Sequence, residues 1–194
     1  FVFAHTASFD IIGYMKYDHH IHHRQSIRLR DYDYSQPGYY FVTICTYQKE
    51  CLFGVIKNGE MQFNELGEIV KNEWLKTSQM RPNVELDEFI VMPNHMHVIL
   101  VITDGCRGVL QYAPTSVNHF RSPSQNIGAI IRGFKSTVTK QINILRNSPQ
   151  TSVWQRNYYD HVIRDDISLN KIREYIIANP AMWDSDEENP ANLK

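Results

Sequence analysis

Two histidines, His95 and His97, stand two residues apart in the segment PNHMHVIL, at the start of an apolar run. In a β-strand alternate side chains point to the same face, so both rings would share a face with their Cα atoms roughly 6.5 Å apart. Two imidazoles at that separation can converge on one metal ion. Two histidines satisfied within the protein are the commoner reason for this spacing, and a divalent ion needs more than two ligands. A metal site therefore requires a third ligand from another part of the chain.

A candidate for that ligand lies near the end of the chain, in the segment KIREYIIANP. Tyr175 and Asn179 are four residues apart, so on a helix they share one face. The amide oxygen of Asn179 is a hard ligand that suits Mg²⁺ or Mn²⁺, and Tyr175 adds a phenol one helical turn away. A tyrosine packed in the core and an asparagine that ends a helix would have the same spacing. If the set is functional, the ion can polarise a phosphodiester oxygen while the tyrosine attacks phosphorus.

Hydrophobic spacing and turn residues predict the elements that must position these side chains. Amphipathic helices are expected after Asn64, after Ser124, and after one of Asp165, Asp166 or Ser168. The strands are expected over 39–47, 85–92, 95–103 and 153–163, with a further hairpin over 52–63 that turns at Asn58-Gly59. This order favours an α+β fold, in which helices pack against a mostly antiparallel sheet.

The balance of charge limits how the chain could bind nucleic acid. It has 194 residues, 42% of them hydrophobic, and a formal net charge of −1. One domain with its own core is expected at this length, and any DNA contact must come from local basic clusters, because the total is not basic. A solvated surface charge is the ordinary role of each such residue taken alone. The candidates are Arg24, Arg28 and Arg30 in an N-terminal arm, Arg132, Lys135 and Lys140 on the second helix, and Arg156 and Arg164 beside the late strand.

Cysteine usage and hydropathy bear on the compartment. The three cysteines are odd in number and lack CxxC spacing, which favours a reduced, cytoplasmic protein. No apolar run approaches the roughly 20 residues of a membrane span, so no membrane association is expected.

With these residues assembled, the chain resembles the HUH-type single-tyrosine transposases, and among them the REP-associated tyrosine transposases. The runs that carry the resemblance are RQSIRLRDYDYSQPGYYFVTICT, VMPNHMHVIL, SPSQNIGAIIRGFKSTVTKQIN, VWQRNYYDHVIRD and YIIANP. The resemblance implies a ferredoxin-like sheet with helices on one face. It also implies that His95 and His97 are the metal-binding pair, Asn179 the third ligand and Tyr175 the nucleophile. The implied reaction is cleavage and rejoining of single-stranded DNA at palindromic hairpins, through a 5′-phosphotyrosine bond that leaves a free 3′-OH.

The resemblance also implies a division of the chain. We expect an N-terminal extension and basic arm over 1–36, the transposase domain over 37–183 and an acidic tail over 184–194. Members of the family act as monomers or as homodimers, and the sequence is compatible with both.

Alternatives to this assignment remain open. Tyr158 and Tyr159 are rival tyrosines, expected to pack in the sheet or to stack on bases, and His161 is a possible additional site residue. The chain could instead be a non-catalytic nucleic-acid-binding module that kept the fold. A third reading is a metal-dependent phosphodiesterase that activates water, with Tyr175 structural. A covalent adduct between protein and DNA would separate the strand transferase from both.

Overall fold

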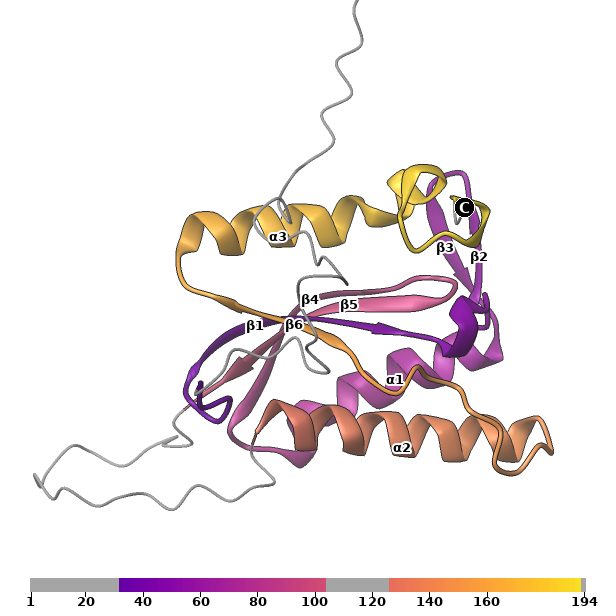
Figure 1. The fold of residues 1–194 in the computed structure, drawn as a ribbon, viewed down its shortest axis with the longest axis horizontal. Helices are drawn as coiled ribbons and strands as arrows, with labels where there is room; N and C mark the ends of the chain where they lie inside the picture. Colours follow the sequence, from indigo (N-terminus) through magenta and orange to yellow (C-terminus); the bar gives the residue numbers. More distant parts are fainter. Residues whose placement is uncertain (1–31, 104–125, 193–194) are drawn as a thin grey trace, which may run out of the picture.

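The computed structural model describes residues 32–103 and 126–192. Of the predicted arm over 1–36, the arginines Arg24, Arg28 and Arg30 lie outside these residues. The elements are β1 (Gly38–Cys45), β2 (Gly54–Lys57), β3 (Glu60–Phe63), α1 (Glu65–Met80), β4 (Val84–Val91), β5 (His95–Ile102), α2 (Ile127–Leu145), β6 (Tyr159–Ile163) and α3 (Asp166–Ala178), with short 3₁₀ helices at Tyr47–Lys49, Asn179–Ser185 and Pro190–Asn192. The main sheet has the strand order β4-β5-β1-β6, and each neighbouring pair is antiparallel. Strands β2 and β3 form a separate hairpin (Figure 1).

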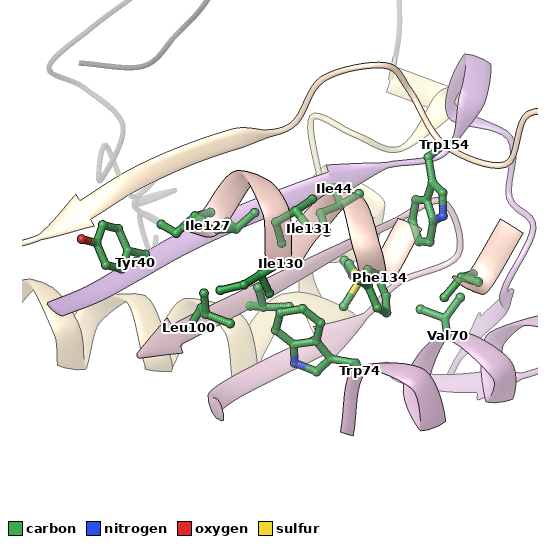
Figure 2. Close-up of a cluster of buried hydrophobic side chains, with 14 of the residues drawn as sticks. Tyr40, Ile44, Val70, Trp74, Leu100, Ile127, Ile130, Ile131, Phe134 and Trp154 are labelled. Carbon is green, nitrogen blue, oxygen red and sulfur yellow. The ribbon is translucent and has the colours of Figure 1, made fainter. Parts of the chain in front are cut away.

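The larger part of the core lies between the sheet and the pair of helices α1 and α2. Alternate residues of β1 and β5 point to this side and are fully buried against the apolar stripes of both helices. Figure 2 shows this cluster, which includes Tyr40, Ile44, Val70, Trp74, Leu100, Ile127, Ile130, Ile131, Phe134 and Trp154. Helices α1 and α2 therefore cover the face of the sheet opposite to His95 and His97.

Helix α3 covers the other face of the sheet (Figure 1). A second apolar cluster forms there, made of Phe41, Ile99 and Ile163 from the strands and Leu169, Ile172 and Ile176 from α3. The predicted α+β fold with an antiparallel sheet is confirmed, and α1 and α2 share one face as expected. Helix α3 lies on the opposite face from α1 and α2, which differs from the expected one-sided arrangement. The histidine face also carries the apolar side chains Phe41, Ile99 and Ile163, and covering them with α3 stabilises the fold.

Local sequence accounts for most of the element boundaries. The Asn64 side chain accepts hydrogen bonds from two backbone N–H groups of the first turn of α1, and Asp165 caps α3 in the same way through Ser168, as predicted. Asn58 and Gly59 both have positive φ, as a two-residue hairpin turn requires. The cap of α2 is Asn126 and not the predicted Ser124.

The late strand is shorter than the predicted 153–163, because Trp154 leaves the sheet. Trp154 makes only an isolated bridge to Thr46. The centroid of its indole ring lies 5.2 Å from the ring centroid of Phe53 and 5.8 Å from that of Phe134. Burying this large apolar ring outweighs the ladder hydrogen bonds that a longer strand would add.

In the described part of the chain, no helix has both the length and the apolar character needed to cross a membrane.

Candidate metal and nucleophile site

His95 and His97 open strand β5 and lie on one face of the sheet, as their spacing predicts. Their neighbours across β1 are Cys45 and Thr43, respectively, and their ring centroids are 4.6 Å apart. Both rings are buried, with exposed fractions of 0% for His95 and 4% for His97. Two imidazole rings that could each offer a nitrogen to an ion are thus held side by side in a site from which most water is excluded.

The hydrogen bonds of Asn94 determine the tautomer of His95. The amide nitrogen of Asn94 donates to the backbone carbonyls of Lys49 and Glu188, so its oxygen is left to accept from His95 Nδ1, 2.8 Å away. The proton of a neutral His95 therefore sits on Nδ1, and Nε2 carries a lone pair. That lone pair is buried and has no hydrogen-bond partner among residues 32–103 and 126–192.

His97 contacts a hydroxyl group at each ring nitrogen. Nδ1 lies 2.8 Å from Thr43 Oγ1, and Nε2 lies 3.2 Å from the Tyr175 hydroxyl oxygen. When Nδ1 donates to Thr43, Nε2 accepts from the phenol and presents its lone pair toward α3. The ring of Phe41 stacks on His97 with centroids 5.4 Å apart, which fixes the plane of the imidazole.

Burial keeps both imidazoles neutral. It lowers the pKa of His95 to about 4, against a smaller opposing effect of the Glu188 carboxylate. It lowers the pKa of His97 well below its usual value, and the neighbouring His95 adds to this. Neutral imidazole is the form that ligates metal ions, so the site needs no deprotonation of histidine at neutral pH.

Helix α3 supplies Tyr175 and Asn179 to the same site. Its apolar stripe, Ile172 and Ile176, is buried against Phe41 and Ile99, which turns the adjoining stripe of α3 toward the histidines. Tyr175 reaches His97 from there, and Asn179, at the end of the helix, is 2% exposed. Burial raises the pKa of the Tyr175 hydroxyl, and nearby carboxylates led by Asp186 raise it further. The phenol is therefore protonated at neutral pH, and its ionisation calls for positive charge beside it.

The sequence did not indicate Asp186, which also lies in the site. The 3₁₀ helix Asn179–Ser185 reverses the chain after α3 and brings Asp186 Oδ2 to 3.9 Å from His95 Nε2. Asn179 donates from its amide nitrogen to the same carboxylate oxygen at 3.2 Å. In the sequence this aspartate belongs to an acidic run without a recognisable motif, so no local signal could have identified it.

The donor set fits a divalent cation. One ligand atom each of His95, His97 and Asp186 lies within 4.8 Å of the others. His95 Nε2 and the amide oxygen of Asn179 are both buried, and neither has a hydrogen-bond donor in the described part of the chain. Buried acceptors that face one another without a donor are costly. A cation bound by nitrogen and oxygen ligands would satisfy them.

The rival tyrosines and His161 have different surroundings from Tyr175. Tyr158 packs against the core on the side of α1 and α2. Tyr159 is on the histidine face, where its ring meets Phe41 at 6.3 Å between centroids. His161 pairs with Phe41 on the edge strand β6 and is exposed. Tyr175, by comparison, touches His97 with its hydroxyl.

Four of the predicted DNA-contacting residues gather on the other side of the sheet. Arg132, Lys135, Lys140 and Arg156 line one pocket between α2 and the segment 150–156. Lys135 also links α2 to the segment before β6, because its ammonium group donates to the backbone carbonyls of Gln155 and Asn157. The other three are exposed and remain available to a ligand. Arg164, after β6, is exposed but is not part of this lining.

The chain was compared with known proteins by sequence and by structure. No family model matches the chain. An uncharacterized protein of Haemophilus influenzae is 47% identical over 176 residues, which cover 89% of this chain and 96% of that protein. The solved structure of a REP-associated tyrosine transposase bound to a REP hairpin matches with a TM-score of 0.53 at 19% identity, over 79% of this chain and 72% of that one. The expected resemblance is thereby confirmed at the level of the fold.

Proposed function

The chain belongs to the same family as the Haemophilus influenzae protein and has the fold of a REP-associated tyrosine transposase, and on this basis we propose that it is a metal-dependent enzyme that cleaves and rejoins single-stranded DNA. The observation that carries the proposal is the contact of 3.2 Å between the Tyr175 hydroxyl oxygen and His97 Nε2. It lies beside buried acceptors that have no hydrogen-bond donor among residues 32–103 and 126–192. The contact places the phenol oxygen beside the histidine nitrogen that would ligate an ion, where positive charge would favour its ionisation.

His95, His97 and Asn179 would hold a divalent ion, Mg²⁺ or Mn²⁺, which supplies positive charge that polarises a phosphodiester oxygen and favours ionisation of a nearby phenol. The protein's own contribution is to orient these groups. Asn94 and Thr43 fix the ring nitrogens of the two histidines, as outer partners of metal ligands do.

Tyr175 is the nucleophile in this proposal. Its oxygen forms a bond to phosphorus, and the bond between phosphorus and the 3′-oxygen breaks. The phenol gives up its proton, and the leaving oxygen takes up a proton to become a free 3′-OH. The product is a 5′-phosphotyrosine, and attack by a 3′-OH on that bond reverses the step and rejoins the strands. The contact between Tyr175 and His97 forms within one chain, which supports a monomer that cleaves with its own tyrosine.

DNA in hairpin form is the proposed substrate. The solved relative is bound to a REP hairpin, and the exposed Arg132, Lys140 and Arg156 of the pocket beside α2 offer positive charge for a phosphate backbone. The basic arm with Arg24, Arg28 and Arg30 would add to this charge. Lys135 contributes as a structural support of the same surface.

Trapping the covalent intermediate tests the proposal. The chain is incubated with Mn²⁺ and end-labelled hairpin oligonucleotides taken from the DNA around its gene, and the products are run on denaturing gels. We expect an adduct with the wild type and with Tyr159→Phe, and none with Tyr175→Phe. Cleavage without an adduct would favour the water-activating phosphodiesterase instead. Hairpin binding without cleavage in any divalent ion would favour the non-catalytic module.

A further inference from the structure

The segment that follows α3 is anchored beside the candidate metal site through Glu188. The backbone carbonyl of Glu188 accepts from the amide of Asn94, 2.7 Å away, next to His95. The Glu188 carboxylate pairs with Lys49 at 3.0 Å. Asp186 lies within this anchored segment, and its side chain is only 5% exposed. Its carboxylate is therefore held at the site by the fold and is not a free group of a solvated tail.

The carboxylate of Asp186 is buried, and its hydrogen-bonding capacity is only partly used. One oxygen accepts from the backbone N–H of Glu188 at 2.6 Å, and the other accepts from the Asn179 amide at 3.2 Å. Among the residues that the structure describes, no lysine or arginine nitrogen lies within ion-pair distance of it. His95 Nε2 lies 3.9 Å from Asp186 Oδ2, but this nitrogen carries a lone pair and not a proton. Both oxygens still have lone pairs to give.

We propose that Asp186 is a direct ligand of the divalent ion, in addition to His95, His97 and Asn179. This inference rests on the proposed metal site and adds its only anionic ligand. A separation of 3.9 Å is too long for a hydrogen bond. It is short enough for His95 Nε2 and Asp186 Oδ2 to reach one ion at about 2.1 Å each. Two imidazoles and an amide are neutral, whereas Mg²⁺ and Mn²⁺ favour carboxylate oxygen.

A direct ligand differs from a positioning residue in its consequences. If Asp186 acted only by holding the Asn179 amide, replacing Asp186 would not weaken metal binding further in a protein that already lacks the Asn179 side chain. If its oxygen binds the ion, its removal weakens binding in both backgrounds.

Binding of Mn²⁺ to the full chain without DNA tests the proposal, measured by loss of the electron paramagnetic resonance signal of free Mn²⁺. Asp186→Asn should weaken binding at least about tenfold, while it keeps the size of the side chain and an oxygen that accepts from Asn179. Glu187→Gln removes the same charge from an adjacent, exposed side chain and should leave the affinity unchanged. In an Asn179→Ala background, Asp186→Asn should again weaken binding about tenfold or more.

The possible outcomes separate this inference from the proposed function. Equal Mn²⁺ affinity of the wild type and Asp186→Asn, or no further loss in the Asn179→Ala background, would overturn Asp186 as a ligand and leave the other three in place. Failure of the wild type to bind Mn²⁺ would overturn the proposed metal site itself. If Asp186→Asn does not fold, anomalous diffraction from wild-type crystals soaked in Mn²⁺ decides. A carboxylate oxygen of Asp186 in contact with the ion supports the proposal, and an ion without that contact refutes it.

Discussion

Replacing His95 with glutamine should change how the stability of the metal-free protein depends on pH. Burial lowers the pKa of His95 to about 4, against about 6.5 in an unfolded chain. Between these values the unfolded state takes up a proton that the folded state excludes, so the free energy of unfolding falls as the pH falls through this window. The gap between the two pKa values corresponds to about 3 kcal/mol in all, and about 2 kcal/mol of it should be lost between pH 7 and pH 5.

The assay is urea unfolding of the wild type and of His95→Gln in EDTA at both pH values. The variant lacks the titrating ring, so the wild type should lose about 2 kcal/mol relative to it on going to pH 5. An ion pair between a protonated His95 and Asp186, whose atoms lie 3.9 Å apart, would give the opposite sign, because the pKa of His95 would then be raised. A wild type that holds or gains stability relative to the variant would refute the neutral, ligand-ready imidazole.

Three further results are expected. Thr43→Val removes the hydroxyl 2.8 Å from His97 Nδ1 and should weaken Mn²⁺ binding about tenfold. Thr43→Ser keeps a hydroxyl and should keep the wild-type affinity. Equal affinities of all three proteins would contradict this. His97→Ala, or EDTA added to the wild type, should abolish cleavage while gel-shift assays still detect hairpin binding; cleavage at the wild-type rate would remove the metal from the mechanism. Lys140→Ala and Arg156→Ala should each weaken hairpin binding and lower its log–log salt slope by about one unit, and unchanged slopes would place the DNA elsewhere.

Short-range patterns were enough to predict two relations in the site, the shared face of the histidines and the shared stripe of Tyr175 and Asn179. His95 and His97 share a face because side chains alternate along β5, and Tyr175 and Asn179 share a stripe because they are four apart on α3. Both relations hold wherever the strand and the helix pack. The hairpin turn at Asn58-Gly59 and the cap at Asn64 follow from equally local chemistry.

Long-range packing decided the features that the sequence did not indicate. Which face of the sheet α3 covers depends on the combined apolar surface of Phe41, Ile99 and Ile163, which come from three strands. The approach of Asp186 to His95 depends on the chain reversal after α3 and on the contacts of Glu188 with Asn94 and Lys49. Neither relation has a fixed spacing along the chain, so periodicity could not reveal it.

Identification of the residue that becomes bonded to DNA tests the central claim most directly. Wild-type protein would be trapped on a hairpin oligonucleotide in Mn²⁺, digested with protease and nuclease, and the modified peptide sequenced by mass spectrometry. The account predicts a 5′-phosphate linkage on Tyr175, the tyrosine whose hydroxyl lies 3.2 Å from His97 Nε2. A linkage on Tyr158 or Tyr159, or efficient cleavage with no linked peptide, would contradict it.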